Sequence, residues 1–314
     1  MQTVVLAAGF GTRLSPVTDN RSKAMAPVAG RPLVELAIAP LVRFGLTDVV
    51  FVVGPQDLEI QRHFEDWTDL DLRTRFAVQE QRLGMAHALE IAAPFLDGSF
   101  FLTACDSLIE ESLVGDMLAK HTEESAVLSL MEVAPDQVGR SAAVDLDGES
   151  VRRIVEKPAP GEAPSNIVSL PHYILPHGIL DLLGKIEPSP RGEIELQSAI
   201  QGLIDRECRV VGVRTDSRSQ VSNSDDLLRL NLNALRSADP GDLASAQIFD
   251  LTTVLNPPVL VEEGATVGRH CTIGPNVYLE RGCVICDGVS LRDAVVLRGA
   301  TVASRRRVCG ELLS

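Results

Sequence analysis

Short apolar runs alternate with amphipathic stretches over residues 2–230 of this 314-residue chain. The apolar runs have the length of buried strands, and they are Thr3–Ala8, Val49–Val53, Phe100–Ala104, Ala126–Val133 and Val210–Val213. The stretches between them place apolar residues at helical spacing, as in Leu33–Phe44, Leu58–Phe64, Met85–Ala93 and Ile179–Ile186. This alternation predicts an α/β fold with a mostly parallel sheet and helices on both faces. Pro40 lies inside the first helix, where a kink or break is expected.

A different pattern, with a period of six residues, begins at Val259. Aliphatic residues recur at this spacing, at Val261, Val267, Ile273, Leu279, Ile285, Leu291 and Leu297. A second inward position is held by Ala265, Cys271, Val277, Cys283, Val289 and Val295. One strand and one turn per six residues, with three such units in each coil, is the pattern of a parallel β-helix. The pattern resembles the left-handed type, and we expect about two to three coils.

The change of period predicts two domains. Asp225–Arg236 has the pattern of an amphipathic helix, and the Pro-Gly pair in 237–241 ends it. We therefore place the boundary between residues 237 and 255. A Rossmann-like domain is expected over 1–240, and a linker with the β-helix over 241–314. The β-helix is the expected site of self-association, because it is too short to offer much of a cleft for chemistry.

Charge and composition narrow the choice of partners and location. The chain has 29 basic and 43 acidic residues and a net charge of −14, which disfavours nucleic acid as a partner. Since no stretch approaches the ~18 apolar residues of a membrane span, a membrane is not expected either. The N-terminus has no basic segment before its first strand, so we expect a cytoplasmic protein. Six cysteines in that location predict free thiols, and Cys271 and Cys283 fit the interior of the β-helix.

A glycine-rich segment follows the first strand directly. Gly9 and Gly11 let backbone N–H groups converge and let a ligand approach closely. Arg13 and Lys23 add positive charge, so the segment has what a triphosphate with Mg²⁺ requires. Leu14 occupies the position of the third glycine in the dinucleotide fingerprint, which excludes that motif. The P-loop is excluded as well, because Gly-Thr-Arg stands where Gly-Lys-Ser/Thr is needed.

The sequence motif that contains these glycines is more specific for one protein family than the glycines alone. It reads G-x-G-T-R-L-x-P-x-T and continues as K-x-M-x-P-V, and Val155–Pro158 reads V-E-K-P. These motifs resemble those of the sugar-1-phosphate nucleotidyltransferases, and the resemblance spans most of the chain. It implies that a nucleoside monophosphate passes from an NTP to a sugar 1-phosphate with release of pyrophosphate. It also implies Mg²⁺ as the cofactor.

The resemblance assigns roles to individual residues. The nucleotide is expected to contact Leu6, Ala8, Gly9, Gly11, Thr12 and Arg13, with its base on Gln79 and Gly84. Arg13, Lys23 and Asp106 are the expected catalytic residues. The sugar phosphate is expected to meet Glu156, Lys157, Asn166 and Gly139. Because Gln79 suits a pyrimidine, UTP or dTTP is favoured, and the sugar stays open.

The second metal ligand is where the chain departs from the family. The family usually has W-x-D-V-G-T-P-x-D-L near residue 220, whereas Gln220 stands here at the position of its aspartate. Asn223 is a second candidate, and an amide oxygen ligates Mg²⁺ less strongly than a carboxylate does. We therefore keep Asp106, Gln220 and Asn223 as candidate metal ligands. The departure leaves a second interpretation open, in which the chain is a nucleotide-binding regulatory homologue with weakened catalysis.

Overall fold

The computed structural model describes residues 1–65, 72–239 and 250–314, which form two compact units. Unit 1 comprises residues 1–9 and 34–220, and unit 2 comprises residues 10–33 and 221–314. The segment 10–33, which we call the signature loop, is thus grouped with the C-terminal part of the chain. The boundary predicted between 237 and 255 overlaps residues 240–249, which lie outside the described residues, and it stays a prediction.

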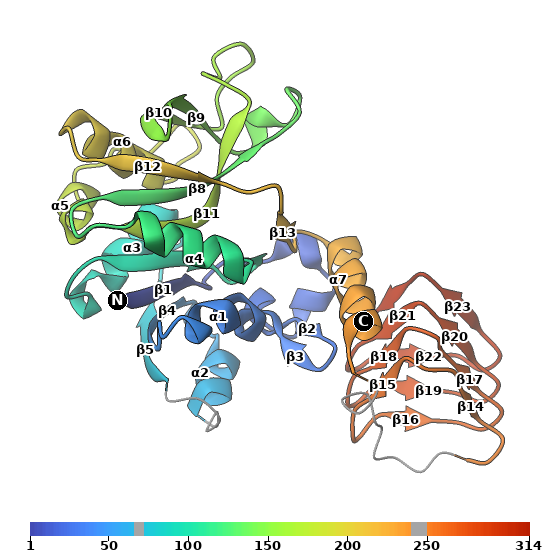
Figure 1. Ribbon diagram of the computed structural model, residues 1–314. Coiled ribbons are helices and arrows are strands. Elements are labelled where there is room, and N and C mark those ends of the chain that lie inside the picture. The colour runs from blue at the N-terminus through green and yellow to red at the C-terminus, as the bar shows by residue number, and fades with distance from the viewer. Residues whose placement is uncertain (66–71, 240–249) are drawn as a thin grey trace. The chain divides into compact units, whose positions relative to one another are not determined.

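Unit 1 is built on a nine-stranded sheet in the order β5-β4-β1-β6-β11-β8-β12-β10-β9 (Figure 1). Neighbours from β5 to β6 are parallel, and β10 and β11 run in the opposite direction. The strands are β1 (Gln2–Leu6), β4 (Asp48–Val53), β5 (Arg73–Val78), β6 (Phe100–Ala104), β8 (Ala126–Glu132), β9 (Ala142–Asp147), β10 (Ser150–Glu156), β11 (Ile167–Leu175) and β12 (Val210–Arg214). The predicted α/β fold with a mostly parallel sheet is confirmed.

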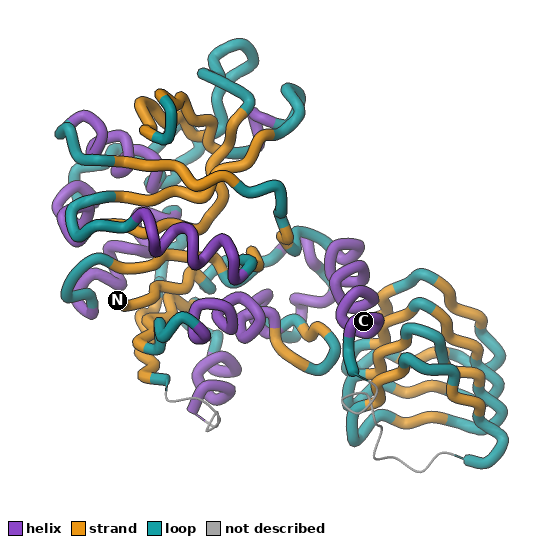
Figure 2. The backbone as a smooth tube through the Cα atoms, in the orientation of Figure 1, coloured by secondary structure: helices purple, strands orange, loops and turns teal. Residues whose placement is uncertain are grey.

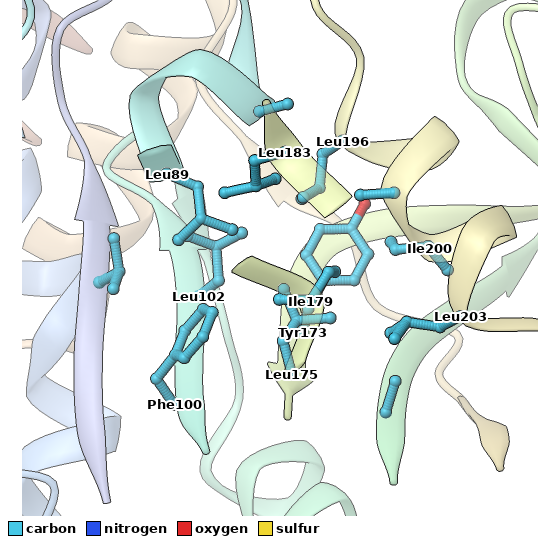
Figure 3. Close-up of a cluster of buried hydrophobic side chains, with 14 of the residues drawn as sticks. Leu89, Phe100, Leu102, Tyr173, Leu175, Ile179, Leu183, Leu196, Ile200 and Leu203 are labelled. Atoms are coloured by element: carbon cyan, nitrogen blue, oxygen red, sulfur yellow. The ribbon is translucent and has the colours of Figure 1, made fainter. Parts of the chain in front are cut away.

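Helices flank both faces of this sheet, because successive residues of a buried strand point to opposite sides (Figure 2). Phe101 packs with Leu41 and Leu113 on one face, whereas Phe100 and Leu102 pack on the other (Figure 3). The helices are α1 (Leu33–Arg43), α2 (Leu58–Glu65), α3 (Met85–Ala92), α4 (Glu111–Lys120), α5 (Leu180–Leu183) and α6 (Leu196–Asp205). Within the described residues, no helix has the length and apolar content needed to cross a membrane.

The first helix forms in spite of Pro40. α1 continues for three residues past the proline and ends at Arg43, so the predicted break is wrong. Ala37, Ile38 and Leu41 on this helix are at most 1% exposed. Burial of these side chains outweighs the hydrogen bond that proline cannot donate.

Unit 2 contains the β-helix, whose strands stack in three parallel sheets (Figure 1). The sheets are β14-β17-β20-β23, β15-β18-β21-β24 and β16-β19-β22. Their strands are β14 (Val254–Leu255), β15 (Val259–Val261), β16 (Thr266–Val267), β17 (Thr272–Ile273), β18 (Val277–Leu279), β19 (Val284–Ile285), β20 (Ser290–Arg292), β21 (Ala294–Val296), β22 (Thr301–Val302), β23 (Arg307–Cys309) and β24 (Leu312–Leu313). The β-helix therefore extends beyond the predicted two to three coils at both ends.

The six-residue period first breaks after β20, and it is one residue short again before β24. Val296, and not Leu297, aligns with Leu279 of the preceding coil, because the turn at Asp293 is one residue shorter than the pattern requires. Ala294 and Val296 therefore face the interior, where Val295 and Leu297 were expected. The prediction of strict spacing is wrong from this turn onward. Asp293 has a left-handed backbone (φ 46°), as the tight turn demands.

The cysteines are all free thiols, as the sequence predicts. Cys271 and Cys283 are at most 1% exposed and belong to the apolar interior of the β-helix. Burial raises the pKa of the Cys283 thiol to about 12, with a further contribution from the nearby Glu280 carboxylate. Both positions are therefore structural.

Candidate functional site

Two candidate residues of unit 1, Gln79 and Asp106, lie where parallel strands end. We call this side of the sheet, formed by the C-terminal ends of β5, β4, β1 and β6, the carboxyl edge. Gln79 follows β5 directly, and its backbone N–H donates to the Val53 carbonyl oxygen at the end of β4 (2.8 Å). Cys105 follows β6, and its N–H donates to the carbonyl oxygen of Leu6, the last residue of β1 (3.1 Å). Asp106 comes next in the chain. This edge is where open α/β sheets bind their ligands.

Gln79 and Gly84, the predicted base-binding residues, lie together at the carboxyl edge. The Gln79 side chain is buried, with Nε2 3.3 Å from the Gly84 carbonyl oxygen and 3.1 Å from Nδ1 of His87. Gly84 has φ 113°, and a Cβ there would lie 2.6 Å from the Ile194 carbonyl oxygen. Glycine is therefore required by the approach of a backbone segment. Ile194 holds this segment from both sides, because its N–H donates to the Leu83 carbonyl oxygen (2.6 Å) and its carbonyl oxygen accepts from the Ala86 N–H (3.1 Å).

Two residues at this edge were not predicted to act there. Arg82 donates from Nε to the carbonyl oxygen of Ala8, and its guanidinium group also lies against Gly54 at the end of β4. His87 of α3 contacts the Gln79 side chain through Nδ1. The only sequence signal for either was its closeness to Gly84. Arg82 fixes the chain at the start of the glycine-rich segment, and His87 orients the predicted base reader.

Gln220 pairs with the residue that follows the predicted metal ligand Asp106. β13 (Ser219–Gln220) pairs antiparallel with β7 (Ser107–Leu108), and this pairing puts Gln220 opposite Ser107. Oε1 of Gln220 accepts a hydrogen bond from Nη2 of Arg218 at 2.8 Å. A carboxylate with an amide oxygen is a donor set that suits Mg²⁺, provided that the ion displaces Arg218.

Further protein ligands are not gathered around this pair. In the part of the chain that the structure describes, no three His, Cys, Asp or Glu side chains are grouped to hold a metal ion. Mg²⁺ commonly binds through one or two carboxylates and completes its shell with substrate phosphates and water. The residues present therefore fit an ion that arrives with the nucleotide.

Asn223 has a local function that explains its side chain. It is the N-cap of α7 (Ser224–Ser237), and its Oδ1 accepts a hydrogen bond from the Asp226 N–H at 3.0 Å. Such a cap contributes about 1 kcal/mol to helix stability. Asn223 therefore has a structural use in α7, and its role as a metal ligand stays a prediction.

A buried histidine supports the turn that carries Asp106. His172 on β11 places Nδ1 2.9 Å from Oγ1 of Thr103 and Nε2 3.1 Å from Oγ of Ser107. Ser107 directly follows Asp106, so the contact links the turn that carries Asp106 to the middle of the sheet. Burial lowers the pKa of His172 to about 3, and the ring is neutral at physiological pH.

This histidine is expected to make the protein less stable as the pH falls below about 6.5. Its pKa is lower in the folded than in the unfolded chain, so the unfolded chain binds the proton first and stability is lost. Between pH 7.5 and 5.0 the loss amounts to about 2 kcal/mol. The free energy of unfolding is measured by urea titration at both pH values. In His172→Gln its decrease from pH 7.5 to 5.0 should be smaller than in the wild type by about 2 kcal/mol. In the control His177→Gln, which changes an exposed histidine, the decrease should equal that of the wild type. Equal pH dependence in wild type and His172→Gln would refute the assignment.

Three of the four residues predicted to meet the sugar phosphate lie in the V-E-K-P segment or against it. Lys157 has a left-handed backbone (φ 42°), and its Nζ lies 3.3 Å from Oε1 of Glu156. Burial raises the pKa of Glu156, and the adjacent Lys157 ammonium group opposes that change. A Cβ on Gly139 would lie 3.4 Å from the Pro158 carbonyl oxygen, so the turn 138–140 packs on the same segment. Gly139, Glu156 and Lys157 are thus brought together.

Asn166 is placed differently. It immediately precedes β11, and its Nδ2 donates to Oε1 of Glu132 at 2.8 Å on the exposed side of the sheet. The side chain is therefore directed toward β8 and not toward the V-E-K-P segment. A sugar contact by Asn166 stays a prediction.

The signature loop is shaped by contacts inside unit 2. Gly11 has φ 66°, and its carbonyl oxygen accepts a hydrogen bond from Oγ1 of Thr18 at 3.0 Å. A Cβ on Gly11 would lie 3.0 Å from Cβ of Lys23, so glycine is needed for the loop to close. Arg13 lies exposed on the 3-10 turn Thr12–Leu14, and Lys23 is buried at the start of the turn Lys23–Met25. Of the two cations predicted to meet the phosphates, Arg13 is thus exposed and Lys23 is buried.

Comparison with known proteins decides the family. The family model described as nucleotidyl transferase matches residues 2–237. The chain belongs to this family. A second model, described as the GMPPB C-terminal domain, matches residues 255–312 of this nucleotidyl transferase and thus its β-helix.

Relatives of this nucleotidyl transferase carry names that refer to different nucleotides. A glucose-1-phosphate thymidylyltransferase of Streptomyces griseus is 29% identical over 333 residues, covering 100% of this chain and 92% of the relative. A mannose-1-phosphate guanylyltransferase 1 of Arabidopsis thaliana is 30% identical, with coverages of 100% and 86%. The UTP–glucose-1-phosphate uridylyltransferase AglF of Haloferax volcanii is 33% identical, with coverages of 69% and 88%. A solved UDP-glucose pyrophosphorylase complexed with UDP-glucose shares the fold, with a TM-score of 0.67 at 21% identity over 76% of this chain and 99% of that chain.

Proposed function

We propose that this nucleotidyl transferase joins a nucleoside monophosphate from an NTP to a sugar 1-phosphate, and releases pyrophosphate and an NDP-sugar. The observation that carries the proposal is the placement of Gln79 and Asp106 on one carboxyl edge, in a chain whose family match covers residues 2–237. The relatives named above are enzymes that act on sugar 1-phosphates according to their names.

The protein contributes mainly position and charge to this reaction. An oxygen of the sugar phosphate attacks the α-phosphorus, the bond to the β-phosphate oxygen breaks, and pyrophosphate leaves in line. We assign Arg13 and the Gly9–Thr12 backbone to the β- and γ-phosphates and Lys23 to the α-phosphate. Lys157 holds the incoming phosphate, and Glu156 accepts hydrogen bonds from sugar hydroxyl groups. Leu6 and Ala8 belong to the nucleotide site through their place at the end of β1.

The metal of the proposed reaction is Mg²⁺, held by Asp106 with the Gln220 amide oxygen. When bound, the ion neutralises charge on the phosphates as the bond to pyrophosphate breaks. Asp106 would hold the ion through its carboxylate, and the Gln220 amide oxygen would be available to it only without its hydrogen bond to Arg218. Because Gln220 is neutral, the ion is held less strongly than by two carboxylates.

A pyrimidine nucleotide is the proposed donor. Nε2 of Gln79 is held by the Gly84 carbonyl and by His87, which leaves Oε1 to accept a hydrogen bond from the N3–H of uracil or thymine. UTP or dTTP is therefore favoured. A cytoplasmic location and self-association through the β-helix belong to the same proposal.

The engagement of Gln220 by Arg218 supports one alternative, a regulatory homologue that binds nucleotide but turns over slowly. The two candidates are separated by measuring pyrophosphate release with UTP, dTTP, GTP and CTP against glucose, mannose and N-acetylglucosamine 1-phosphates in Mg²⁺. We expect kcat/KM for UTP or dTTP to exceed that for the other nucleotides by about tenfold or more, which corresponds to about 1.4 kcal/mol. Nucleotide binding without turnover would favour the regulatory homologue, and absence of both would contradict either function.

A further inference from the structure

The signature loop has little regular structure of its own. It consists of single 3-10 turns, at Thr12–Leu14, Val17–Asp19 and Lys23–Met25, followed by the short strands β2 (Pro27–Val28) and β3 (Arg31–Pro32). A segment of this kind keeps one conformation only when side chains elsewhere hold it. In unit 2 the available supports are α7 and the β-helix, which contact each other (Figure 1).

The first support is an ion pair between the loop and the β-helix. Both terminal nitrogens of Arg21 donate to Glu280, at 2.7 Å to Oε1 and 2.9 Å to Oε2. The two side chains are only 4% and 8% exposed. Such a bidentate salt bridge fixes both the distance and the relative orientation of the two side chains, and their burial excludes water from it. Glu280 directly follows β18, so the loop is tied to the second coil of the β-helix.

The rest of the β-helix holds Glu280 in place. Its Oε2 also accepts a hydrogen bond from the backbone N–H of Arg298 at 2.8 Å, one coil further along. Nη2 of Arg298 donates to the carbonyl oxygen of Asn20 at 2.8 Å, next to Arg21. The loop is thus anchored at two adjacent residues by two adjacent coils.

The second support lies on the other side of Lys23. Asn231 of α7 is completely buried, and its Oδ1 accepts a hydrogen bond from the Ala29 N–H at 2.8 Å. Its Nδ2 donates to the Pro27 carbonyl oxygen at 3.0 Å. Residues 20–21 and 27–29 are therefore both held, and Lys23 lies between the two anchors.

We propose that Glu280 and Asn231 are positioning residues for nucleotidyl transfer, acting through the signature loop on Lys23 and Arg13. This inference rests on the proposed function of those two cations, and it gives the β-helix a part in catalysis besides self-association. A loop that is held at both sides has its cations in position before the NTP binds. The entropic cost of ordering the loop is therefore absent from both NTP binding and turnover. Contact of Arg21 with the triphosphate itself is the competing explanation.

The first test needs no substrate. Hydrogen–deuterium exchange is compared between the full-length wild type, Glu280→Gln and Asn231→Leu. We expect peptides covering 10–33 to exchange about tenfold faster or more in both variants, with the β1, β4 and β6 peptides unchanged. Arg306→Gln is the matched control, because it removes an arginine–glutamate pair of the same β-helix (Arg306 with Glu311, 2.9 Å) that does not involve the loop. Unchanged exchange in the loop would overturn the inference.

The second test measures kinetics per folded enzyme. We expect Glu280→Gln to raise KM for the NTP and to lower kcat by about tenfold each, while KM for the sugar 1-phosphate stays within about twofold. The double variant Arg21→Gln/Glu280→Gln should lose no more than either single variant, because each residue acts through the other. Faster exchange with unchanged kinetics, or a loss confined to the Arg21 variants, would refute positioning by Glu280. If the wild type shows no turnover at all, the proposed function fails, and the exchange result still decides whether the β-helix holds the loop.

Discussion

Replacement of Asp106 by alanine is expected to reduce kcat by about 10²–10³-fold, the loss that follows when one preorganised charge contact of a transition state is removed. Asp106 lies at the carboxyl edge after β6, and Gln220 is the only other metal ligand that we propose. Because that partner is neutral, the metal depends on Asp106 more than it would in a site with two carboxylates. Steady-state pyrophosphate release at saturating substrates measures the effect.

Two further variants show whether the Asp106 effect concerns the metal. Asp106→Asn keeps the shape of the side chain, and we expect excess Mg²⁺ to restore part of its activity because an amide oxygen still ligates the ion. Asp116→Asn removes an exposed carboxylate from α4 and should keep wild-type kcat. Near-normal turnover by Asp106→Ala, with an unchanged unfolding midpoint, would remove Asp106 from the mechanism.

The residues of the carboxyl edge can be found in the sequence, because they depend only on where each apolar run ends. Each parallel strand is a continuous apolar run, and the polar residue that follows it must emerge at the same edge as its neighbours. Gln79 follows β5 and Asp106 follows β6, and the register of β1, β4, β5 and β6 puts both strand ends on one edge, although the roles of the two residues came from the family resemblance. The β-helix could be predicted for a similar reason, because its six-residue period of aliphatic residues is visible in one continuous stretch of sequence.

What could not be predicted depends on contacts between distant residues or on side chains with two possible uses. No local pattern pairs Arg21 with Glu280, so the grouping of the signature loop with the β-helix was not foreseen. Asn223 matches both a metal ligand and an N-cap, and only the backbone geometry of α7 separates the two. The short turn at Asp293 shifts the inward positions by one residue, which a strict six-residue count cannot detect.

Replacement of Lys23 by alanine is expected to lower kcat by about 10²–10³-fold as well, since it removes the charge proposed to meet the α-phosphate. Lys23 is buried at the start of the turn Lys23–Met25, so the variant is compared with the wild type per folded protein. Its turnover should collapse at temperatures at which thermal unfolding shows that the variant is folded. Pyrophosphate release and thermal unfolding, measured on the same preparation, give both quantities.

Lys23→Arg separates position from charge. Gly11 leaves little room beside Lys23, because even a Cβ on Gly11 would lie 3.0 Å from that side chain. The larger guanidinium group is therefore expected to recover less than about a tenth of the lost kcat, although the charge is kept. Lys185→Ala, at an exposed lysine of unit 1, is the matched control and should turn over like the wild type. If Lys23→Arg were fully active, a general positive charge would suffice, and the specific placement that the anchored loop provides would be unnecessary.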